Sequence, residues 1–205
     1  FCVCMDVVAV YFSLLRLFSF LFFFQAEDGI RDAQESRGLG DVYKRQLFAI
    51  SEILERRGID IPVMVSATMA DNGGRLLTGQ TLEAFVCSVS HFPLLSIGLN
   101  CAFGAEQMYP FVEELSAITP FFVSAHPNAG LPNQFGEYDQ SAQEMAEIVE
   151  QMLANGLVNI VGGCCGTTPK HIELVANLAQ RYKPRIIPEI PRHTRLSGLE
   201  LLEIR

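Results

Sequence analysis

The sequence predicts an α/β fold in which parallel strands alternate with helices. Short apolar runs rich in β-branched residues are separated by segments whose apolar residues recur at helical spacing. Helix-start signals follow the strands, including Ser141 with Glu144 and Thr168 with Pro169. Cysteines stand at the carboxyl ends of two predicted strands, which is where α/β enzymes place their chemistry.

Four strand–helix units are expected. The predicted strands are residues 61–66, 95–101, 121–126 and 157–161. The predicted helices are residues 81–89, 106–118, 141–155 and 168–178, and residues 47–57 are expected to be the tail of an earlier helix. Strands and helices alternating at this spacing imply parallel strands joined by right-handed crossovers.

The most informative segment is residues 162–166, Gly-Gly-Cys-Cys-Gly. Side chains on a regular strand alternate between faces, so Cys164 and Cys165 cannot both reach one point from ideal β geometry, whereas the flanking glycines allow a turn that brings both sulfurs together. Cys101 ends another predicted strand. A catalytic zinc keeps three protein ligands and one open position, so Cys101, Cys164 and Cys165 are interpreted as a zinc site made of three thiolates.

Other interpretations of these cysteines remain open. Each could be a small buried hydrophobic residue, which is the interpretation favoured for Cys87 on its predicted helix. Cys164 and Cys165 could form a vicinal disulfide, although its ring is strained and a reducing compartment would keep it open. Three thiols completed by Asn128 or a histidine would make a closed, purely structural zinc module.

Four segments carry a family resemblance: residues 98–101, 125–132, 135–139 and 162–169. Together they resemble the homocysteine-binding module of cobalamin-dependent methionine synthases, in the homocysteine S-methyltransferase superfamily, and the resemblance runs from about residue 47 to the C-terminus. Gly-Gly-Cys-Cys-Gly is shared with betaine- and S-methylmethionine-dependent homocysteine methyltransferases, which are the alternative. The loop at 125–139 and the Arg-Leu-Ser-Gly-Leu-Glu segment at 195–200 favour the cobalamin enzyme.

The resemblance implies a (β/α)8 barrel of the TIM type. The four units correspond to its strands 5–8, so the barrel is incomplete and its first and last strands have unpaired backbone groups. In that family the contacts to the ammonium and carboxylate of homocysteine lie largely on strands 1–4. This segment is therefore expected to supply the thiolate site and to be inactive alone.

The chemistry implied by the resemblance is methyl transfer to homocysteine. Zinc held by Cys101, Cys164 and Cys165 would bind the homocysteine thiolate, and the methyl group would come from methylcobalamin on a separate domain. 5-Methyltetrahydrofolate, bound by another domain of the parent chain, would supply that methyl group, and the product is methionine. Asn128 could fill the fourth zinc position when substrate is absent, or it could cap the turn before Gly130.

The histidines and two acidic residues are interpreted as structural or surface residues rather than as catalytic ones. His126 could be a ligand, but a hydrogen-bonded structural histidine is favoured because three thiols already satisfy zinc. Glu137 and Asp139 are interpreted as a contact to an incoming cobalamin domain or as a solvated surface. The three other histidines are interpreted as surface or linker residues: His91, His171 and His193.

Residues 1–46 do not match the predicted fold. Seven of the 15 phenylalanines lie in residues 1–24, which could be a hydrophobic leader or membrane anchor, and residues 24–46 resemble translated sequencing-adapter sequence. The predicted division is residues 1–46 outside the fold, 47–187 as the C-terminal half of the barrel, and 188–205 as a linker toward a folate-binding domain.

Charge, motifs and cysteine content argue against a nucleic-acid partner, a nucleotide cofactor and a membrane partner. Residues 47–205 carry 10 basic and 17 acidic side chains, which argues against a nucleic-acid partner. Neither a Gly-x-Gly-x-x-Gly nor a Walker pattern is present, which argues against a nucleotide cofactor. Thiolate ligands favour a reducing cytoplasm, and no membrane partner is expected.

Overall fold

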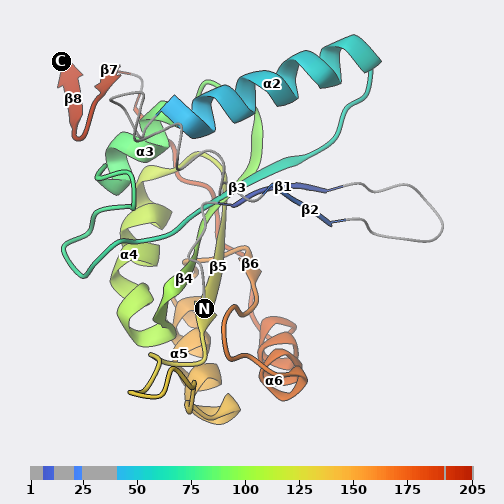
Figure 1. Ribbon diagram of the computed structural model, residues 1–205, viewed down its shortest axis with the longest axis vertical. Coiled ribbons are helices and arrows are strands. Elements are labelled where there is room, and N and C mark those ends of the chain that lie inside the picture. Colours follow the sequence, from blue (N-terminus) through green and yellow to red (C-terminus); the bar gives the residue numbers. More distant parts are fainter. Residues whose placement is uncertain (1–6, 12–20, 25–40, 192, 205) are drawn as a thin grey trace.

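The computed structural model describes residues 7–11, 21–24, 41–191 and 193–204, and its centre is a six-stranded sheet (Figure 1). The strand order is β2-β1-β3-β4-β5-β6. The last four strands are β3 (Val63–Ala67), β4 (Leu94–Gly104), β5 (Phe122–Asn128) and β6 (Ile160–Val161). Neighbours among these four pair in parallel, which confirms the predicted α/β class and agrees with a partial βα barrel.

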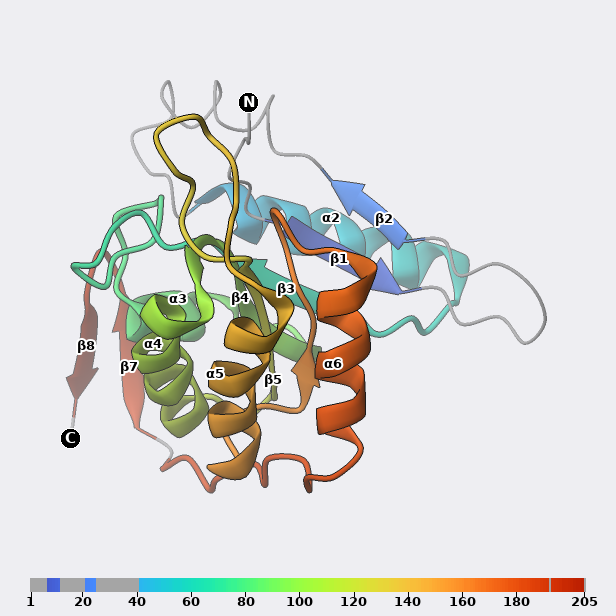
Figure 2. The ribbon, with the colours of Figure 1, turned by 90° about the horizontal axis from the view of Figure 1, so that it is seen from below.

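A helix follows each parallel strand, as predicted. These helices are α3 (Leu82–Val89), α4 (Ala105–Ile118), α5 (Ala142–Ala154) and α6 (Pro169–Ala179). Helices α4, α5 and α6 lie side by side on one face of the sheet (Figure 2). Each connection therefore returns the chain to the same end of the sheet, so the carboxyl ends of the strands share one edge.

Local signals in the sequence account for where the helices begin. Thr81 precedes α3, and its hydroxyl accepts a hydrogen bond from the Ala84 N–H. Ser141 and Glu144 form the predicted capping box at the start of α5. Such caps satisfy N–H groups that have no partner within the helix.

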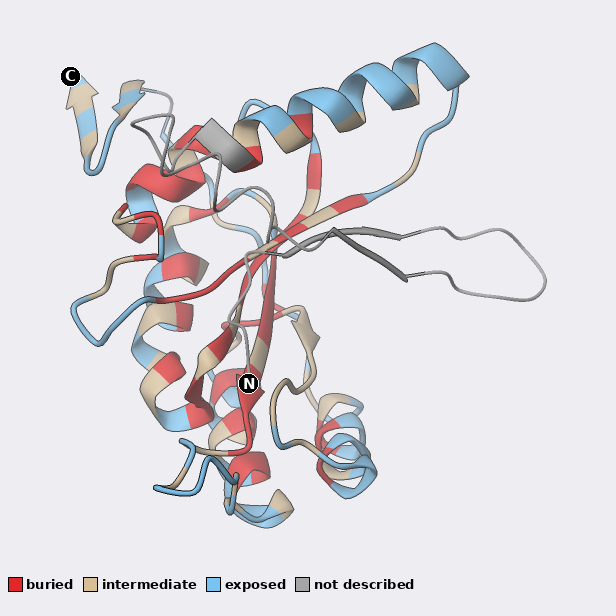
Figure 3. Ribbon diagram, viewed as in Figure 1, coloured by how far each residue is buried: buried red, intermediate tan, exposed pale blue. Residues whose placement is uncertain are grey.

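The core lies between the sheet and its helices, where buried residues cluster (Figure 3). Strand β3 alternates buried and half-buried residues, and β4 is buried along most of its length. The fully buried side chains come from both layers and include Ile97, Leu99, Met108, Leu115 and Met145. This packing holds the strand ends, and the residues that follow them, in fixed positions.

The first helix of the described region, α2 (Asp41–Arg57), begins six residues before the predicted helical tail. Tyr43 on this helix is buried and contacts Phe85 of α3 edge to face, with ring centroids 5.4 Å apart. Strand β1 (Val7–Tyr11) pairs antiparallel with β3, and β2 (Leu21–Phe24) pairs with β1. Of the adapter-like stretch at residues 24–46, residues 25–40 lie outside the described residues and residues 41–46 belong to α2. The proposed division at residue 46 stays a prediction.

The C-terminal segment carries a hairpin made of β7 (Thr194–Ser197) and β8 (Leu201–Ile204). It docks on α3, where the Ser197 hydroxyl donates to the Ala84 carbonyl at 2.6 Å. The Thr81 N–H donates to the Leu199 carbonyl at 2.9 Å. Within the described part of the chain, none of the helices combines the length and apolar character that a membrane crossing needs.

Candidate metal centre

Three cysteines meet at the shared carboxyl edge of the parallel strands. Cys101 lies near the end of β4, and Cys164 and Cys165 lie in the turn between β6 and α6. Their three sulfur atoms lie within 4.8 Å of one another. Among the described residues this is the cluster of His, Cys, Asp and Glu side chains that could hold a metal ion. Cys101 is buried, whereas Cys164 and Cys165 are half-buried.

The separations between the sulfurs test whether zinc fits. Thiolates bound tetrahedrally to zinc at about 2.3 Å lie about 3.8 Å from one another. The Cys165 sulfur is 3.7 Å from that of Cys101 and 4.0 Å from that of Cys164. Cys101 and Cys164 are joined as a disulfide, with their Cα atoms 5.7 Å apart. The donor set therefore fits zinc once this disulfide is reduced, because the metal needs free thiolates.

The backbone at Cys101 is in a conformation that most residues avoid. Cys101 has φ 54° and Ala102 has φ 58°, and these two are the described non-glycine residues with positive φ. The pairing of β4 with β5 shifts its register at the same place, between Asn100 and Gly104. Each left-handed residue costs about 1 kcal/mol or more. The bend lies where Cys101 meets the other two cysteines.

The turn that carries the cysteine pair is held by the residues that end β5. The Cys164 N–H donates to the Pro127 carbonyl at 2.8 Å, and the Cys165 N–H donates to Asn128 Oδ1 at 3.0 Å. The Cys165 carbonyl in turn accepts from the Ala129 N–H at 2.9 Å. Three hydrogen bonds therefore fix the peptide groups of both cysteines against the adjacent strand.

Gly166 allows the turn to close. Its φ is +77°, and a Cβ at this position would lie 2.2 Å from the Cβ of Tyr138. Both the backbone conformation and the approach of Tyr138 therefore require glycine here. The loop that follows β5 can thus pack directly on the cysteine turn.

The structure places Asn128 beside the cluster. Its side chain is buried at 3 % exposure, and its carboxamide oxygen accepts the Cys165 N–H. This contact orients Cys165 and leaves a second lone pair on the same oxygen. The role of Asn128 as a fourth ligand stays a proposal.

The other sequence candidates lie apart from the sulfurs. Burial lowers the pKa of His126, which keeps the ring neutral. Its ring packs against Gly162 and is not part of the cluster. Cys87 is a half-buried free thiol on α3 and is also outside the cluster. Glu137 is exposed in the loop after β5, where its carboxylate accepts from Asn133 at 3.5 Å.

The prediction for His171 was wrong. This residue is buried at 6 % exposure, and both of its ring nitrogens make hydrogen bonds. The available signal was its position three residues after Thr168, where Glu or Gln completes a capping box. His91 is exposed, as expected, and His193 lies 3.8 Å from Glu203 beside the C-terminal hairpin.

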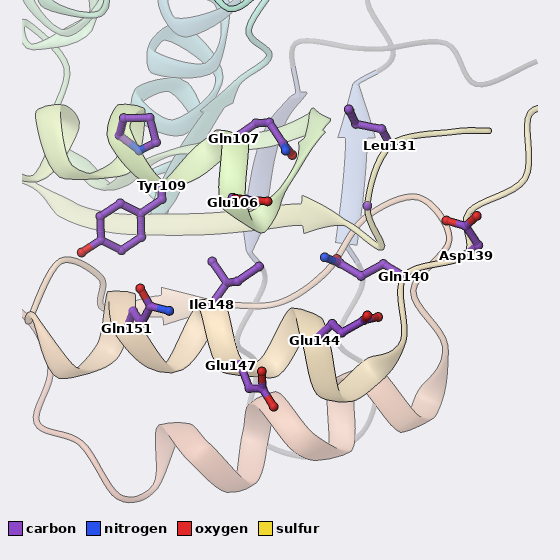
Figure 4. Close-up of a pocket in the computed structure, with 12 residues that line it drawn as sticks. Glu106, Gln107, Tyr109, Leu131, Asp139, Gln140, Glu144, Glu147, Ile148 and Gln151 are labelled. Carbon is purple, nitrogen blue, oxygen red and sulfur yellow. The ribbon is translucent and has the colours of Figure 1, made fainter. Parts of the chain in front are cut away.

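A wide cleft lies near this centre rather than at it. It has a volume of about 990 Å³ between α4, α5 and the loop after β5 (Figure 4). Its lining is acidic and amide-rich and includes Glu106, Asp139, Gln140 and Glu147. None of the three cysteines lines it, so the cleft is not the candidate reaction site.

The fold and the site together define an α/β protein with a thiol cluster at the carboxyl ends of parallel strands. A family model described as Homocysteine S-methyltransferase matches residues 43–179. The chain therefore belongs to the homocysteine S-methyltransferase family. Homocysteine is the expected methyl acceptor for this family. The match begins at residue 43, two residues after the first residue of α2.

Proposed function

We propose that this chain is the part of a cobalamin-dependent methionine synthase that holds zinc and activates homocysteine. The observation that carries the proposal is the convergence of Cys101, Cys164 and Cys165, whose sulfur atoms lie within 4.8 Å. Membership of a family that methylates homocysteine supplies the substrate. The finer assignment rests on the loop at 125–139 and on the 195–200 segment, which resemble the cobalamin enzyme.

The three cysteines are the proposed zinc ligands. Bound zinc would lower the pKa of the homocysteine thiol, so that the sulfur is held as a reactive thiolate. The protein's own contribution is to orient the ligands through the Pro127 carbonyl, the Asn128 carboxamide and the Ala129 N–H, which bond to the peptide groups of the cysteine pair. Such outer contacts position metal ligands and raise metal affinity.

The proposed methyl donor is methylcobalamin on a separate domain of the parent chain, remethylated from 5-methyltetrahydrofolate on another. In the net reaction the homocysteine thiol would lose its proton and its sulfur would gain the methyl group to give methionine, while 5-methyltetrahydrofolate would give up its methyl group and take up a proton to become tetrahydrofolate. Thiolate ligands require a reducing environment, which supports a cytoplasmic location. A betaine- or S-methylmethionine-dependent enzyme is the nearest alternative, and methyl transfer from either donor without cobalamin would favour it.

A structural zinc module is the alternative from another class, and X-ray absorption distinguishes it. The reduced full chain is loaded with zinc, and the metal–sulfur coordination is followed as L-homocysteine is added. We expect three sulfur ligands to become four, because a catalytic site keeps one exchangeable position.

Homoserine, which lacks the thiol, is the matched control and should leave three sulfur ligands. A count that stays at three both with homocysteine and with excess ethanethiol, a thiol that needs none of the amino-acid contacts expected on strands 1–4, would show a closed, structural site. Failure of the reduced chain to bind zinc at all would refute the metal assignment.

A further inference from the structure

His171 connects two segments that are 31 residues apart in the sequence. It lies in the first turn of α6, six residues after Cys165. Its Nδ1 accepts the Thr168 N–H at 3.2 Å, and its Nε2 lies 3.1 Å from the Gln140 carbonyl oxygen. His171, at the third position of α6, thus completes the helix cap and also contacts the Gln140 carbonyl of the preceding loop.

These two contacts determine which nitrogen carries the proton. A backbone N–H can only donate, so Nδ1 is the acceptor and has no hydrogen. A carbonyl can only accept, so Nε2 carries the hydrogen and donates to Gln140. The ring thus serves as acceptor for one segment and donor to the other.

The backbone of Gln140 is linked by hydrogen bonds to the cysteine pair. Its N–H donates to the Ala129 carbonyl at 3.3 Å, and the Ala129 N–H donates to the Cys165 carbonyl at 2.9 Å. The two ends of the loop at 129–140 are thereby joined to each other and to the cysteine turn. The loop also packs on that turn directly, because Tyr138 lies against Gly166.

We propose that His171 is a positioning residue of the thiol site, which ties the loop at 129–140 to the start of α6 and so holds the Cys165 peptide in place. This inference rests on the proposed function. His171 does not touch the sulfurs. It acts through Gln140 and Ala129, and its removal loosens the loop that orients Cys165.

Substitutions at position 171 distinguish the helix cap, made by Nδ1, from the hydrogen bond that Nε2 donates to Gln140. In His171→Asn, the carboxamide oxygen occupies the place of Nδ1 and keeps the cap, but no donor reaches Gln140. In His171→Gln, the longer side chain places an N–H near the position of Nε2 and should restore the connection. Thr168→Ala is the comparison variant. It removes the hydroxyl that lies 2.9 Å from His171 Nδ1 and weakens the cap of α6, while the Thr168 N–H still bonds to Nδ1 and Nε2 still donates to Gln140.

The first measurement is amide hydrogen exchange on the reduced, metal-free full chain. We expect His171→Asn to accelerate exchange at Ala129 and Gln140 about tenfold through local opening of the loop. His171→Gln should exchange near the wild-type rate at these two amides. Thr168→Ala should accelerate exchange in the first turn of α6 alone.

The second measurement is Co²⁺ affinity, followed by thiolate-to-cobalt absorption. His171→Asn should weaken binding about tenfold, as loss of an outer contact to a metal ligand does, and His171→Gln should recover most of the loss. The inference would be overturned if the Ala129 and Gln140 amides of His171→Asn exchanged at the wild-type rate, or if its Co²⁺ affinity were unchanged. It would also be overturned if Thr168→Ala lost as much Co²⁺ affinity as His171→Asn. If the reduced wild-type chain bound no Co²⁺, the proposed function would fail, and the exchange rates would still decide whether His171 holds the loop.

Discussion

Cys101 and Ala102 adopt positive φ although neither is a glycine, and this bend lies where Cys101 meets the other two thiols. Their residue types carry no signal for this conformation, since left-handed backbone is common only for Gly, Asn and Asp. By contrast, Gly166 has positive φ and is the residue type that favours it. The conformation of one half of the site could therefore be predicted from residue type, and that of the other half could not.

The proposed ligands predict a contrast between two cysteine substitutions. Cys164→Ser removes one of three sulfurs from the cluster and should abolish zinc retention or weaken it by more than about tenfold. Cys87→Ser changes a thiol on α3 outside the cluster and should leave the zinc content unchanged. Metal analysis after gel filtration under reducing conditions measures both. Equal zinc loss from the two variants would refute the ligand assignment.

At the scale of elements, the end of α4 depends on a side chain supplied by a segment far along the chain. Arg185 is buried, and its guanidinium donates to the carbonyls of Ser116, Thr119 and Phe121. Within the described part of the chain, no carboxylate is among its hydrogen-bond partners. These carbonyls end α4 or precede β5, where helical partners are lacking. Burial lowers the pKa of Arg185, and the carbonyl oxygens compensate for the water that the guanidinium has lost.

Arg185→Met should therefore destabilise the fold by about 3 kcal/mol, because it leaves several buried carbonyls without donors. Arg181→Met is the matched control, since Arg181 is exposed and pairs with Glu150 at the surface. It should change stability by less than about 0.5 kcal/mol. Urea denaturation gives both free energies of unfolding. Equal effects from the two substitutions would show that the Arg185 contacts do not stabilise the helix end.

At the scale of the whole molecule, the four parallel strands form an open sheet. An open sheet exposes unpaired backbone groups at its edges, which can pair with other chains. One side of β3 is covered by β1, which pairs with it antiparallel between Val7 and Val10. The thiol cluster lies on β4 and after β6, away from that edge.

Deletion of residues 1–40 tests the proposed division of the chain at this scale. The deletion keeps α2, including the buried Tyr43, and uncovers the edge of β3. We expect unchanged Co²⁺ affinity, because the thiol site is built on other strands, together with stronger self-association through the free edge. Sedimentation velocity and cobalt titration measure the two effects. Loss of metal binding in a soluble monomer would show that the N-terminal segment belongs to the functional fold.

The predictions made from the sequence were most accurate where the signal is local. Hydrophobic spacing and caps located the parallel strands and their helices to within a few residues, because those signals act over one or two turns. The bend at Cys101, the double role of His171 and the helix end held by Arg185 were missed. The roles of His171 and Arg185 depend on partners distant in sequence, Gln140 and Ser116, and the bend at Cys101 has no residue type that favours it.

The sequence by itself determined the alternation of strands and helices and the candidacy of Cys101, Cys164 and Cys165, since both follow from residue type and spacing. Only the tertiary structure decided that sulfurs 63 and 64 residues apart share one site, and that the loop at 129–140 packs on it. The physical reason is that these contacts arise when packed strands bring their carboxyl ends to one edge, and no short stretch of sequence contains both partners.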